Sequence, residues 1–287
     1  MLSGFTLVRN AVKLDFPIVP AIRSVLEVCD EVVVNVGKSE DETRDLVAAV
    51  GDPRVRIIDS EWDFTKKNEM LSIETLKAMA ACRGRWGIYI QADEVLHEDG
   101  ARILREKTQE WDGDPQVEGL LVRYAHFYGG FDIVATNRRW YRREVRCIRL
   151  GQDIRPYQGA QGFRVGPDYR KIRARATDAV MFHYGWARPA RAIREKLEIS
   201  KTIYPWSRER SARDQERGYL EWLPLLRRFT GGHPRAAQAW VQDRAVDPER
   251  RIGPRHFKLE HLRFYLSDLI ERLTGARLFE FRNYTPV

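Results

Sequence analysis

The sequence has few cysteines and no long apolar segment. Its three cysteines, Cys29, Cys82 and Cys147, lie far apart without a C-x-x-C pair, which indicates free, buried thiols in a reducing compartment. No apolar run approaches the roughly 18 to 20 residues that cross a bilayer. The N-terminal "MLSGFTLVRNAVK" has an arginine inside a short apolar stretch and no cleavage-site pattern, so it is not typical of a signal peptide. We therefore expect a cytoplasmic protein.

The motifs of several common activities are missing as well. The chain contains no G-x-x-x-x-G-K-[ST], no G-x-G-x-x-G, no G-x-S-x-G and no zinc-ligand spacing. It also has no internal repeat and no low-complexity tract. Because no such motif is present, a function has to be inferred from the order of the elements and the polar residues between them.

The composition is that of a soluble globular protein, with 43% hydrophobic and 31% charged residues. At 287 residues the chain suits one large domain, alone or with a helical extension. The net charge of +8 is unevenly placed, since residues 138–175 contain twelve Arg and Lys against three acids. Such a segment either forms a face for an anionic partner (a nucleotide diphosphate, an anionic glycolipid surface or nucleic acid) or consists of arginines on exposed strands.

The first half of the chain alternates strand and helix patterns. Helical patterns at residues 19–29, 39–50 and 68–81 separate four predicted strands, "FTLVRN", "EVVVNV", "RVRIID" and "WGIYIQ". Ser39 is expected to cap the second helix, with Glu42 at its third position as in a capping box. This alternation predicts a parallel sheet covered by helices on both faces. From about Val117 the pattern changes to strands in hairpin or mixed pairing, and after Arg188 it becomes helical.

Polar residues follow all four strands, at the edge where ligands bind in parallel sheets. The last of them are the adjacent carboxylates Asp93 and Glu94, which would repel each other unless a cation or hydrogen-bond donors lie between them. Mg²⁺ and Mn²⁺ prefer such oxygen ligands and usually also bind substrate phosphates. The alternative is that "DEVLHEDGARIL" only places acids at the positive end of a helix.

Taken together, the N-terminal half resembles glycosyltransferases of family 2, which have the GT-A fold. The resemblance covers roughly residues 3–185 and is carried by Asn10, by S-x-D-x-T at Ser39, Asp41 and Thr43, and by "IYIQADE". Asp93 matches the second Asp of the family's D-x-D motif, and Glu94 matches the acid after it. The sequence departs from the pattern at Gln91, where the first Asp is expected. It departs again at Asn35, one residue out of register with the Asp that meets the nucleotide base.

The resemblance implies an α/β fold, a GT-A-like Rossmann-type mixed sheet flanked by helices, with a C-terminal helical extension. Residues 1–187 would form the catalytic domain, with a nucleotide-binding half at 1–115 and an acceptor half at 116–187, and residues 188–287 the extension. The implied activity is transfer of a sugar from a nucleotide-diphosphate sugar to a glycan or glycolipid acceptor of a bacterial-type cell envelope, with inversion and with Mn²⁺ or Mg²⁺. The implied donor site consists of Arg9, Asn10, Asn35, Ser39, Asp41, Gln91, Ala92, Asp93 and Arg188.

The remaining roles rest on single residues. His183 in "MFHYGWARP" is expected to bind the metal together with Asp93, or else it is a core or capping histidine. An inverting transfer needs a carboxylate as base, and we expect Asp153, with Glu144 as the rival in an arginine-rich strand. His126 and Tyr128 in "YAHFYGG" either line the acceptor pocket or belong to a core aromatic cluster.

Three other functions stay open. Gln91 weakens the metal motif, so a catalytically lapsed sugar-nucleotide binder is one. A nucleotidyltransferase is another, although "LVRNAVKLDF" lacks the glycines of its usual loop. A basic nucleic-acid-binding protein would explain the charge but not four polar strand ends, and we expect no nucleic-acid partner. The tail either contacts an anionic membrane peripherally at its inner face or packs on the catalytic domain; its relevant residues are Trp206, Trp222, Arg227, Arg228 and Trp240.

Overall fold

The computed structural model describes residues 1–204, 219–244, 251–277 and 280–287. Four parallel strands form one side of its main sheet, in the order β3-β2-β1-β4. They are β1 (Leu2–Val8), β2 (Glu31–Gly37), β3 (Val55–Ser60) and β4 (Trp86–Tyr89). Every residue of β1 and β2 is buried, as a parallel sheet covered on both faces requires. The predicted parallel sheet is therefore confirmed.

Beyond β4 the sheet becomes mixed. β8 (Arg143–Arg149) is antiparallel to β4 and to β6 (Gly119–Tyr128), and the long β11 (Arg170–Trp186) is parallel to β6. β9 (Ile154–Tyr157) and β10 (Gly162–Val165) extend this side, and β7 (Ile133–Ala135) pairs with β6. The short β5 (Glu94–Leu96) is antiparallel to β11, with Glu94 opposite His183. This pairing brings the segment after β4 next to the end of β11.

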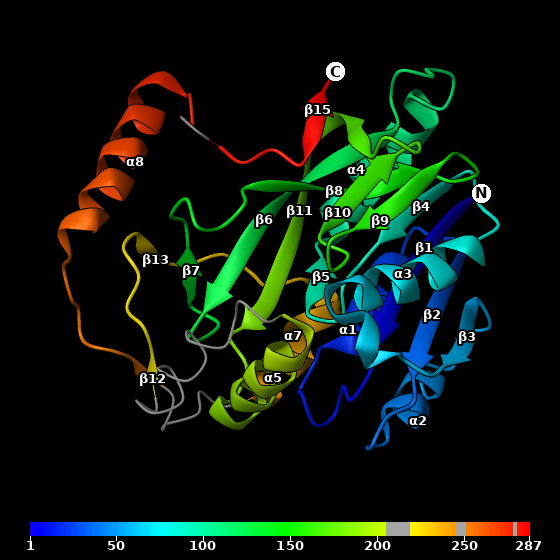
Figure 1. The fold of residues 1–287 in the computed structure, drawn as a ribbon, viewed down its shortest axis with the longest axis horizontal. Coiled ribbons are helices and arrows are strands. Elements are labelled where there is room, and N and C mark those ends of the chain that lie inside the picture. The colour runs from blue at the N-terminus through cyan, green and yellow to red at the C-terminus, as the bar shows by residue number, and fades with distance from the viewer. Residues whose placement is uncertain (205–218, 245–250, 278–279) are drawn as a thin grey trace.

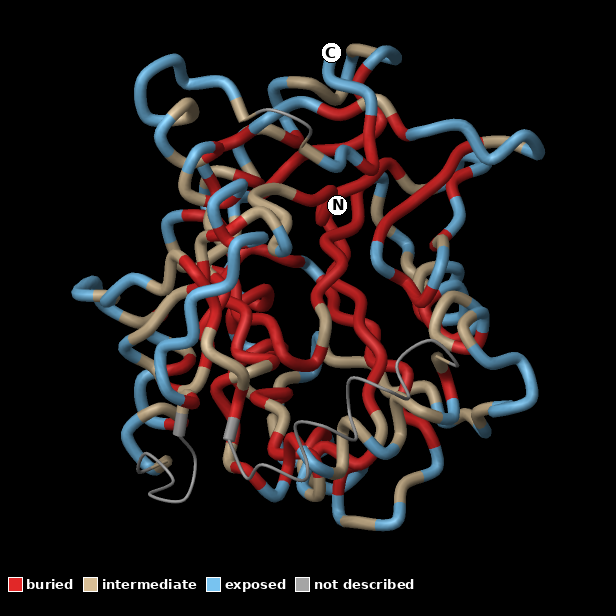
Figure 2. Tube along the Cα trace, turned by 60° about the vertical axis from the view of Figure 1, so that its left-hand side comes forward, coloured by how far each residue is buried: buried red, intermediate tan, exposed pale blue. Residues whose placement is uncertain are grey.

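Helices cover both faces of the sheet, and alternate residues of β2 show how. Val32 and Val34 pack in one core with α1 (Ile18–Leu26) and α4 (Glu98–Glu110), whereas Val33 packs in a second core with α3 (Met70–Ala80). The short α2 (Thr43–Ala48) and the 3₁₀ helix η1 (Phe64–Glu69) follow β2 and β3. Figure 2 shows the buried strands between half-buried and exposed connections.

The C-terminal residues form a helical extension, as expected, but they also add strands. Its helices are α5 (Ala190–Ile203), α7 (Arg235–Asp243), the 3₁₀ turn η3 (Leu259–His261) and α8 (Leu262–Thr274). Its strands are β12 (Tyr219–Leu220), β13 (Leu226–Arg228), β14 (Arg251–Ile252) and β15 (Tyr284–Pro286). β13 pairs with β7, and β15 pairs with β11 beside the C-terminus (Figure 1). The part of the chain with assigned structure contains no helix long and apolar enough to cross a membrane.

Two sequence interpretations change at this level. The helix after β2 begins at Thr43 with Glu42 as its N-cap and no side-chain cap, so the predicted Ser39 capping box is wrong. The Ser39 hydroxyl instead accepts a hydrogen bond from the Asn10 backbone N–H, at 3.1 Å. The reason is a tertiary contact, because the loop after β1 lies close enough for its backbone N–H to bind the Ser39 hydroxyl.

Several arginines of the arginine-rich segment, residues 138–175, are bound by carboxylates or carbonyl groups of the protein itself. Arg146 is fully buried against Glu94, and Arg149 donates to backbone carbonyl oxygens of residues 112, 114 and 117. Arg170 and Arg173 both pair with the buried Glu118. The excess of positive charge in the sequence therefore does not translate into a free basic face at these arginines.

Candidate functional site

A pocket of about 260 Å³ lies beyond the carboxyl ends of β1 and β4. Its floor comes from Arg9 at the end of β1 and from Gln91 to Asp93 after β4. One turn of residues, Gly159 and Ala160, closes it on the side of β9, and α5 lies across it. The pocket therefore lies at the sheet edge where the sequence predicts ligand binding, and one of its walls belongs to the C-terminal extension.

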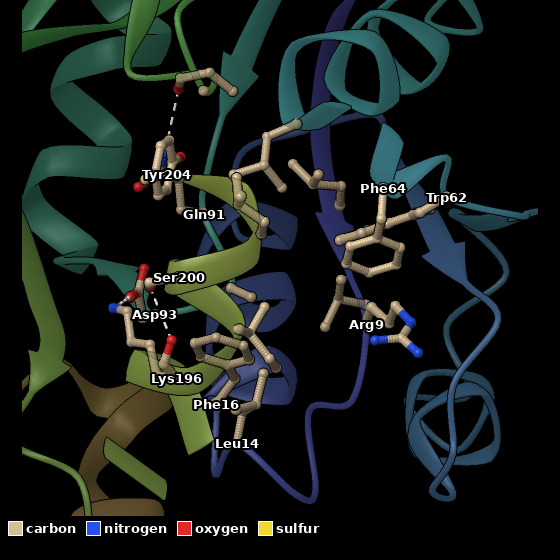
Figure 3. A pocket seen from close by; sticks show the side chains of 18 of the residues that line it. Arg9, Leu14, Phe16, Trp62, Phe64, Gln91, Asp93, Lys196, Ser200 and Tyr204 are labelled. Carbon is tan, nitrogen blue, oxygen red and sulfur yellow. Dashed lines mark hydrogen bonds and ion pairs between the residues drawn. The ribbon is translucent and has the colours of Figure 1, made fainter. Parts of the chain in front are cut away.

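The two ends of the pocket differ in character. Arg9, Trp62 and Phe64 lie on one side, and Asp93 and Lys196 lie on the other (Figure 3). The aromatic end contains Trp62 and Phe64, whereas Leu14 and Phe16 lie beside Lys196 at the other end. A side chain at position 37 would come within 2.5 Å of Trp62 Nε1, so Gly37 is what lets this indole rest on the end of β2.

Arg9 is held in place above the aromatic end. Its guanidinium lies 5.1 Å from the centre of the Phe64 ring, a cation–π geometry. Its Nε donates to the Lys38 carbonyl oxygen at 2.8 Å, and Nη2 pairs with Glu40 at 2.9 Å. Two anchors on the loop after β2 thus fix the orientation of a cation that borders the pocket.

The S-x-D-x-T residues connect the loops after β1 and β2. Asp41 accepts from the Lys13 backbone N–H at 2.7 Å and from the Thr43 N–H at 3.1 Å. The Thr43 hydroxyl accepts from the Ala11 N–H at 2.6 Å, and Asn10, in a left-handed conformation with φ 54°, accepts from the Glu40 N–H at 2.9 Å. These bonds set the shape of the pocket rim, while Ser39 and Asp41 themselves border a neighbouring hollow at the ends of β2 and β3.

Glu94 shapes the turn after β4 from below. One carboxylate oxygen accepts from the Gln91 backbone N–H at 3.0 Å, and the other accepts from the Tyr124 hydroxyl at 2.7 Å. Arg146 forms a two-point ion pair with the same carboxylate, with Nη2 2.9 Å and Nε 3.1 Å from its oxygens. Glu94 therefore holds the Gln91–Asp93 turn and faces the core, not the pocket.

Asp93 faces the other way, toward α5 and β11. Its Oδ2 lies 3.0 Å from Lys196 Nζ and 3.6 Å from His183 Nε2. Burial by itself raises the pKa of Asp93, but Lys196, His183 and Arg188 together hold that pKa well below its usual range. A side chain at position 185 would come within 2.5 Å of His183 Nε2 and 2.7 Å of Asp93 Oδ2, so Gly185 permits this close grouping.

A second histidine orients His183. His126 Nε2 lies 2.8 Å from the Tyr141 carbonyl oxygen, which can only accept, so Nε2 carries the proton. His126 Nδ1 is then the acceptor for His183 Nδ1–H, 3.1 Å away. Burial and the neighbouring His183 hold the pKa of His126 well below its usual value. His126 thus fixes the His183 ring through Nδ1 and leaves Nε2 as the ring nitrogen that faces Asp93, which is the arrangement of a histidine oriented by a supporting partner.

The donor set nevertheless does not suit a divalent cation well. Asp93 and His183 supply two donors, and the Gln91 amide N–H groups are directed to the Ala160 carbonyl and the Tyr89 hydroxyl. Within the described residues, no group of three or more His, Cys, Asp or Glu side chains is placed so that it could hold a metal ion. The Lys196 ammonium already neutralises the carboxylate that the ion would need.

The structure brings together several of the residues that the sequence singled out. Arg9, Gln91, Ala92 and Asp93 line the pocket, and His183 contacts Asp93. Asn10, Ser39 and Asp41 support its rim. Arg188 is fully buried behind the pocket, where it donates to the Leu14 carbonyl and lies over the Phe16 ring. Burial lowers the pKa of Arg188 to about 10, within the range where the guanidinium stays charged at neutral pH.

Other predicted residues lie away from the pocket. Asn35 points into the core, where its amide donates to Glu74 at 2.8 and 2.9 Å, because the side chain leaves β2 two residues before the strand ends. Asp153 precedes β9, at the opposite end from Gly159, and pairs with Arg155 at the surface. Tyr128 is buried and donates to the Glu221 carbonyl, while His126 borders a separate cavity beside α8.

The rival base Glu144 and the tail residue Trp240 also turn inward. Glu144 is buried in β8, and burial raises the pKa of its carboxyl group. Trp240 is buried against Phe131 and Tyr184, so it is not available to a membrane surface. Trp206 lies outside the described residues.

Sequence reasoning missed Lys196, Trp62 and Phe64. Lys196 is separated from Asp93 by 103 positions, and its helix was assigned to an appendage. The sequence does contain a signal for Trp62 and Phe64. They lie in "EWDF", directly after the third predicted strand, at the same edge of the sheet as the polar residues that follow the other strands.

Comparison with known proteins adds the following. No known family profile matches the sequence, and no curated protein matches it. Among solved structures, the chain is similar to TarS from S. aureus in complex with UDP-GlcNAc, with a TM-score of 0.36, 15% identity, and coverage of 48% of this chain and 37% of that one. It is also similar to glucosyl-3-phosphoglycerate synthase from Mycobacterium tuberculosis in complex with Mn²⁺ and UDP-Glc, with a TM-score of 0.31, 18% identity and 44% coverage of each chain. The chain spans less than half the length of either protein.

Proposed function

We propose that this chain is a glycosyltransferase that moves a sugar from a nucleotide-diphosphate sugar to a glycan or glycolipid acceptor, with inversion. The pocket carries the proposal, because Trp62 and Phe64 lie with Arg9 at one end, Asp93 and Lys196 lie at the other, and both ends lie beyond the carboxyl ends of β1 and β4. A nucleotide sugar has matching parts, since its base is flat and its diphosphate is anionic.

The aromatic end suits the base. Phe64 and Trp62 offer ring faces on which a base can stack, and the fixed Arg9 guanidinium adds a cation at the same end. The charged end suits the diphosphate, because positive groups there stabilise the charge that grows on the leaving group as the glycosidic bond breaks. No metal step belongs to this proposal, since among the described residues Asp93 of the pocket and His183 behind it do not belong to any group of three His, Cys, Asp or Glu side chains that could hold a metal ion.

The base of the reaction is a separate question. Asp93 is the only carboxylate among the described residues that line the pocket, and it is committed to Lys196. Asp153 stays a prediction of the sequence, without a contact to the pocket. We assign the proton of the acceptor hydroxyl to Asp153, the base that the sequence predicts, as the acceptor oxygen bonds to the anomeric carbon and the nucleoside diphosphate leaves.

A binding panel tests the proposal. UDP, GDP, dTDP and their glucose and N-acetylglucosamine conjugates would be added to the purified chain with Mn²⁺ and, separately, with EDTA. We expect at least one nucleotide to raise the melting temperature by several degrees, as tight binding to the folded state requires. Phe64→Ala should remove most of this shift, whereas Tyr169→Ala, an exposed aromatic outside the pocket, should not. Stabilisation by none of these nucleotides would refute the proposal.

Gln91 favours a second candidate, a sugar-nucleotide binder without turnover. In this chain the Gln91 side chain holds the Gly159–Ala160 turn through its bond to the Ala160 carbonyl, which is a structural use of the position. Donor hydrolysis, measured as release of the nucleoside diphosphate over hours without an acceptor, separates the two candidates. Binding without any release, with or without candidate glycan acceptors, would favour the binder.

We further propose that α8 makes the membrane contact that a glycolipid acceptor would require. Leu262, Leu266, Leu269 and Leu273 recur at spacings of three and four residues, and all are 44% to 76% exposed. Arg263 and Arg272 fall on the two flanks of this leucine face, where their charges suit anionic headgroups. α8 lies at the outer edge of the molecule, away from the parallel strands (Figure 1).

Co-sedimentation with vesicles tests this contact. Vesicles of phosphatidylglycerol and phosphatidylcholine should bind the chain, and Leu266→Glu with Leu273→Glu should abolish binding. Leu76→Glu, at a leucine on α3 that is exposed to 40%, serves as the matched control and should leave binding unchanged. Equal binding by the α8 variant and the control would remove α8 from the contact.

A further inference from the structure

We propose that Lys196 supplies the positive charge for the donor diphosphate that a divalent cation would otherwise supply, so that the site works without metal. This inference rests on the proposed function and deepens it. The sequence resemblance implies a metal site after β4, but the side chains of Gln91, Asp93 and Lys196 there do not suit a divalent cation.

The position of Lys196 is the first observation. The side chain reaches from α5 into the pocket, and its ammonium lies 3.0 Å from Asp93 Oδ2, at the charged end (Figure 3). Asp93 is 8% exposed, and the lysine side chain keeps 26% of its surface exposed. An ammonium has three N–H donors, and the Asp93 contact uses one of them. The remaining donors can therefore serve a ligand that enters the pocket.

Competition with a metal is the second observation. A divalent ion bound by Asp93 Oδ2 and His183 Nε2 would share Asp93 Oδ2 with the lysine ammonium, at a distance where two cations repel strongly in a buried site. The residue at the first position of the motif is Gln91, a neutral amide that could offer a metal only its carbonyl oxygen and whose N–H groups bind protein acceptors. The chain thus lacks a carboxylate where the ion needs one and has a cation where the ion would be.

The surroundings are the third observation. Arg188, fully buried next to this group, adds a second positive charge without reaching the pocket surface. Trp186 lies under the lysine, with Nζ 5.5 Å from its ring centre. Asp93, Trp186 and the helix thus hold one ammonium in a fixed place, which is what a charge-stabilising group needs in order to act without reorganisation.

The experiment compares nucleotide binding in EDTA and in Mn²⁺ for three chains. The probes are UDP, GDP and dTDP, each titrated calorimetrically into the wild type, Lys196→Gln and Lys201→Gln. Lys201 is on the same helix, outside the pocket lining, and pairs with Glu198. We expect wild-type and Lys201→Gln binding to be equal in the two buffers, and Lys196→Gln binding to be at least tenfold weaker. Lys196→Arg should keep part of the affinity, because it keeps the charge.

The outcomes separate this inference from the proposed function. Binding that requires Mn²⁺ would overturn the inference and leave the glycosyltransferase proposal standing. Equal affinity of Lys196→Gln and wild type in EDTA would also overturn it. Absence of binding in both buffers would refute both proposals. Melting temperatures without ligand, recorded for every variant, establish that a loss of affinity is not a loss of the fold, and Lys196→Arg provides the test if Lys196→Gln fails to fold.

Discussion

The adjacent residues Asp93 and Glu94 each form an ion pair, and the two pairs lie in different surroundings. Glu94 pairs with Arg146 in the core, where both side chains are fully buried and the guanidinium makes a two-point contact. Asp93 pairs with Lys196 at the pocket, through one contact and with the lysine partly exposed. The core pair uses its hydrogen-bonding capacity on protein groups, whereas the pocket pair keeps capacity for a ligand. Saturation of the hydrogen-bond donors, and not the presence of charge, distinguishes the core pair from the pocket pair.

Breaking the core pair should have the largest effect. Arg146→Met leaves the Glu94 carboxylate buried without its cation, and we expect a loss of about 3–5 kcal/mol in the free energy of unfolding. Urea denaturation followed by circular dichroism measures this loss. The double variant Arg146→Met with Glu94→Gln should recover part of it, and a single variant as stable as the wild type would contradict the structural role.

Disturbing the pocket pair without changing its charge should have an intermediate effect. Gly185→Ala places a methyl group within 2.5 Å of His183 Nε2 and 2.7 Å of Asp93 Oδ2. We expect a loss of about 1–3 kcal/mol of stability, as for other overpacked sites, together with weaker nucleotide binding. Gly113→Ala, where the added methyl group meets open space, is the matched control and should be neutral. Unchanged binding by Gly185→Ala would mean that the Asp93–His183 spacing does not matter.

A third carboxylate, Glu118, gives a comparison under changing pH. Burial raises the pKa of Glu118, but hydrogen bonds from Arg170 and Arg173 outweigh it and lower that pKa below its usual value near 4.5. The carboxylate therefore stabilises the fold above pH 4.5, and this contribution is lost as the pH falls through the lowered value. Urea unfolding midpoints would be measured from about pH 7 down to about pH 3. As the pH falls, the midpoint should decrease less steeply for Glu118→Gln than for the wild type. Identical slopes for variant and wild type would refute this.

The smallest effect is expected at the surface pair of Asp153 with Arg155. Both side chains are 47% exposed, so Asp153→Asn should leave stability and nucleotide binding unchanged. Sugar transfer is the informative readout, since a complete loss of transfer with intact binding would establish Asp153 as the base. Transfer at the wild-type rate would remove it from the reaction.

Much of the first 115 residues could be predicted from the sequence, because the patterns there are local. "EVVVNV" has no polar face to expose and so becomes a central strand, and the strands before and after it are separated by amphipathic helices. Asp93 could be singled out because it follows a buried strand. Asn35 shows the limit, since the strand continues for two residues past it and its side chain turns into the core.

The sequence by itself determined the order of strands and helices and the edge of the sheet at which polar residues gather, since hydrophobic periodicity acts within a few residues. Only the tertiary structure decided the partners of Asp93 and Glu94. Lys196 is 103 residues away from the first and Arg146 is 52 residues away from the second, so neither pairing leaves a local trace. Adjacent carboxylates were drawn to opposite sides because the turn after β4 lies between a core that supplies a guanidinium and a helix that supplies an ammonium.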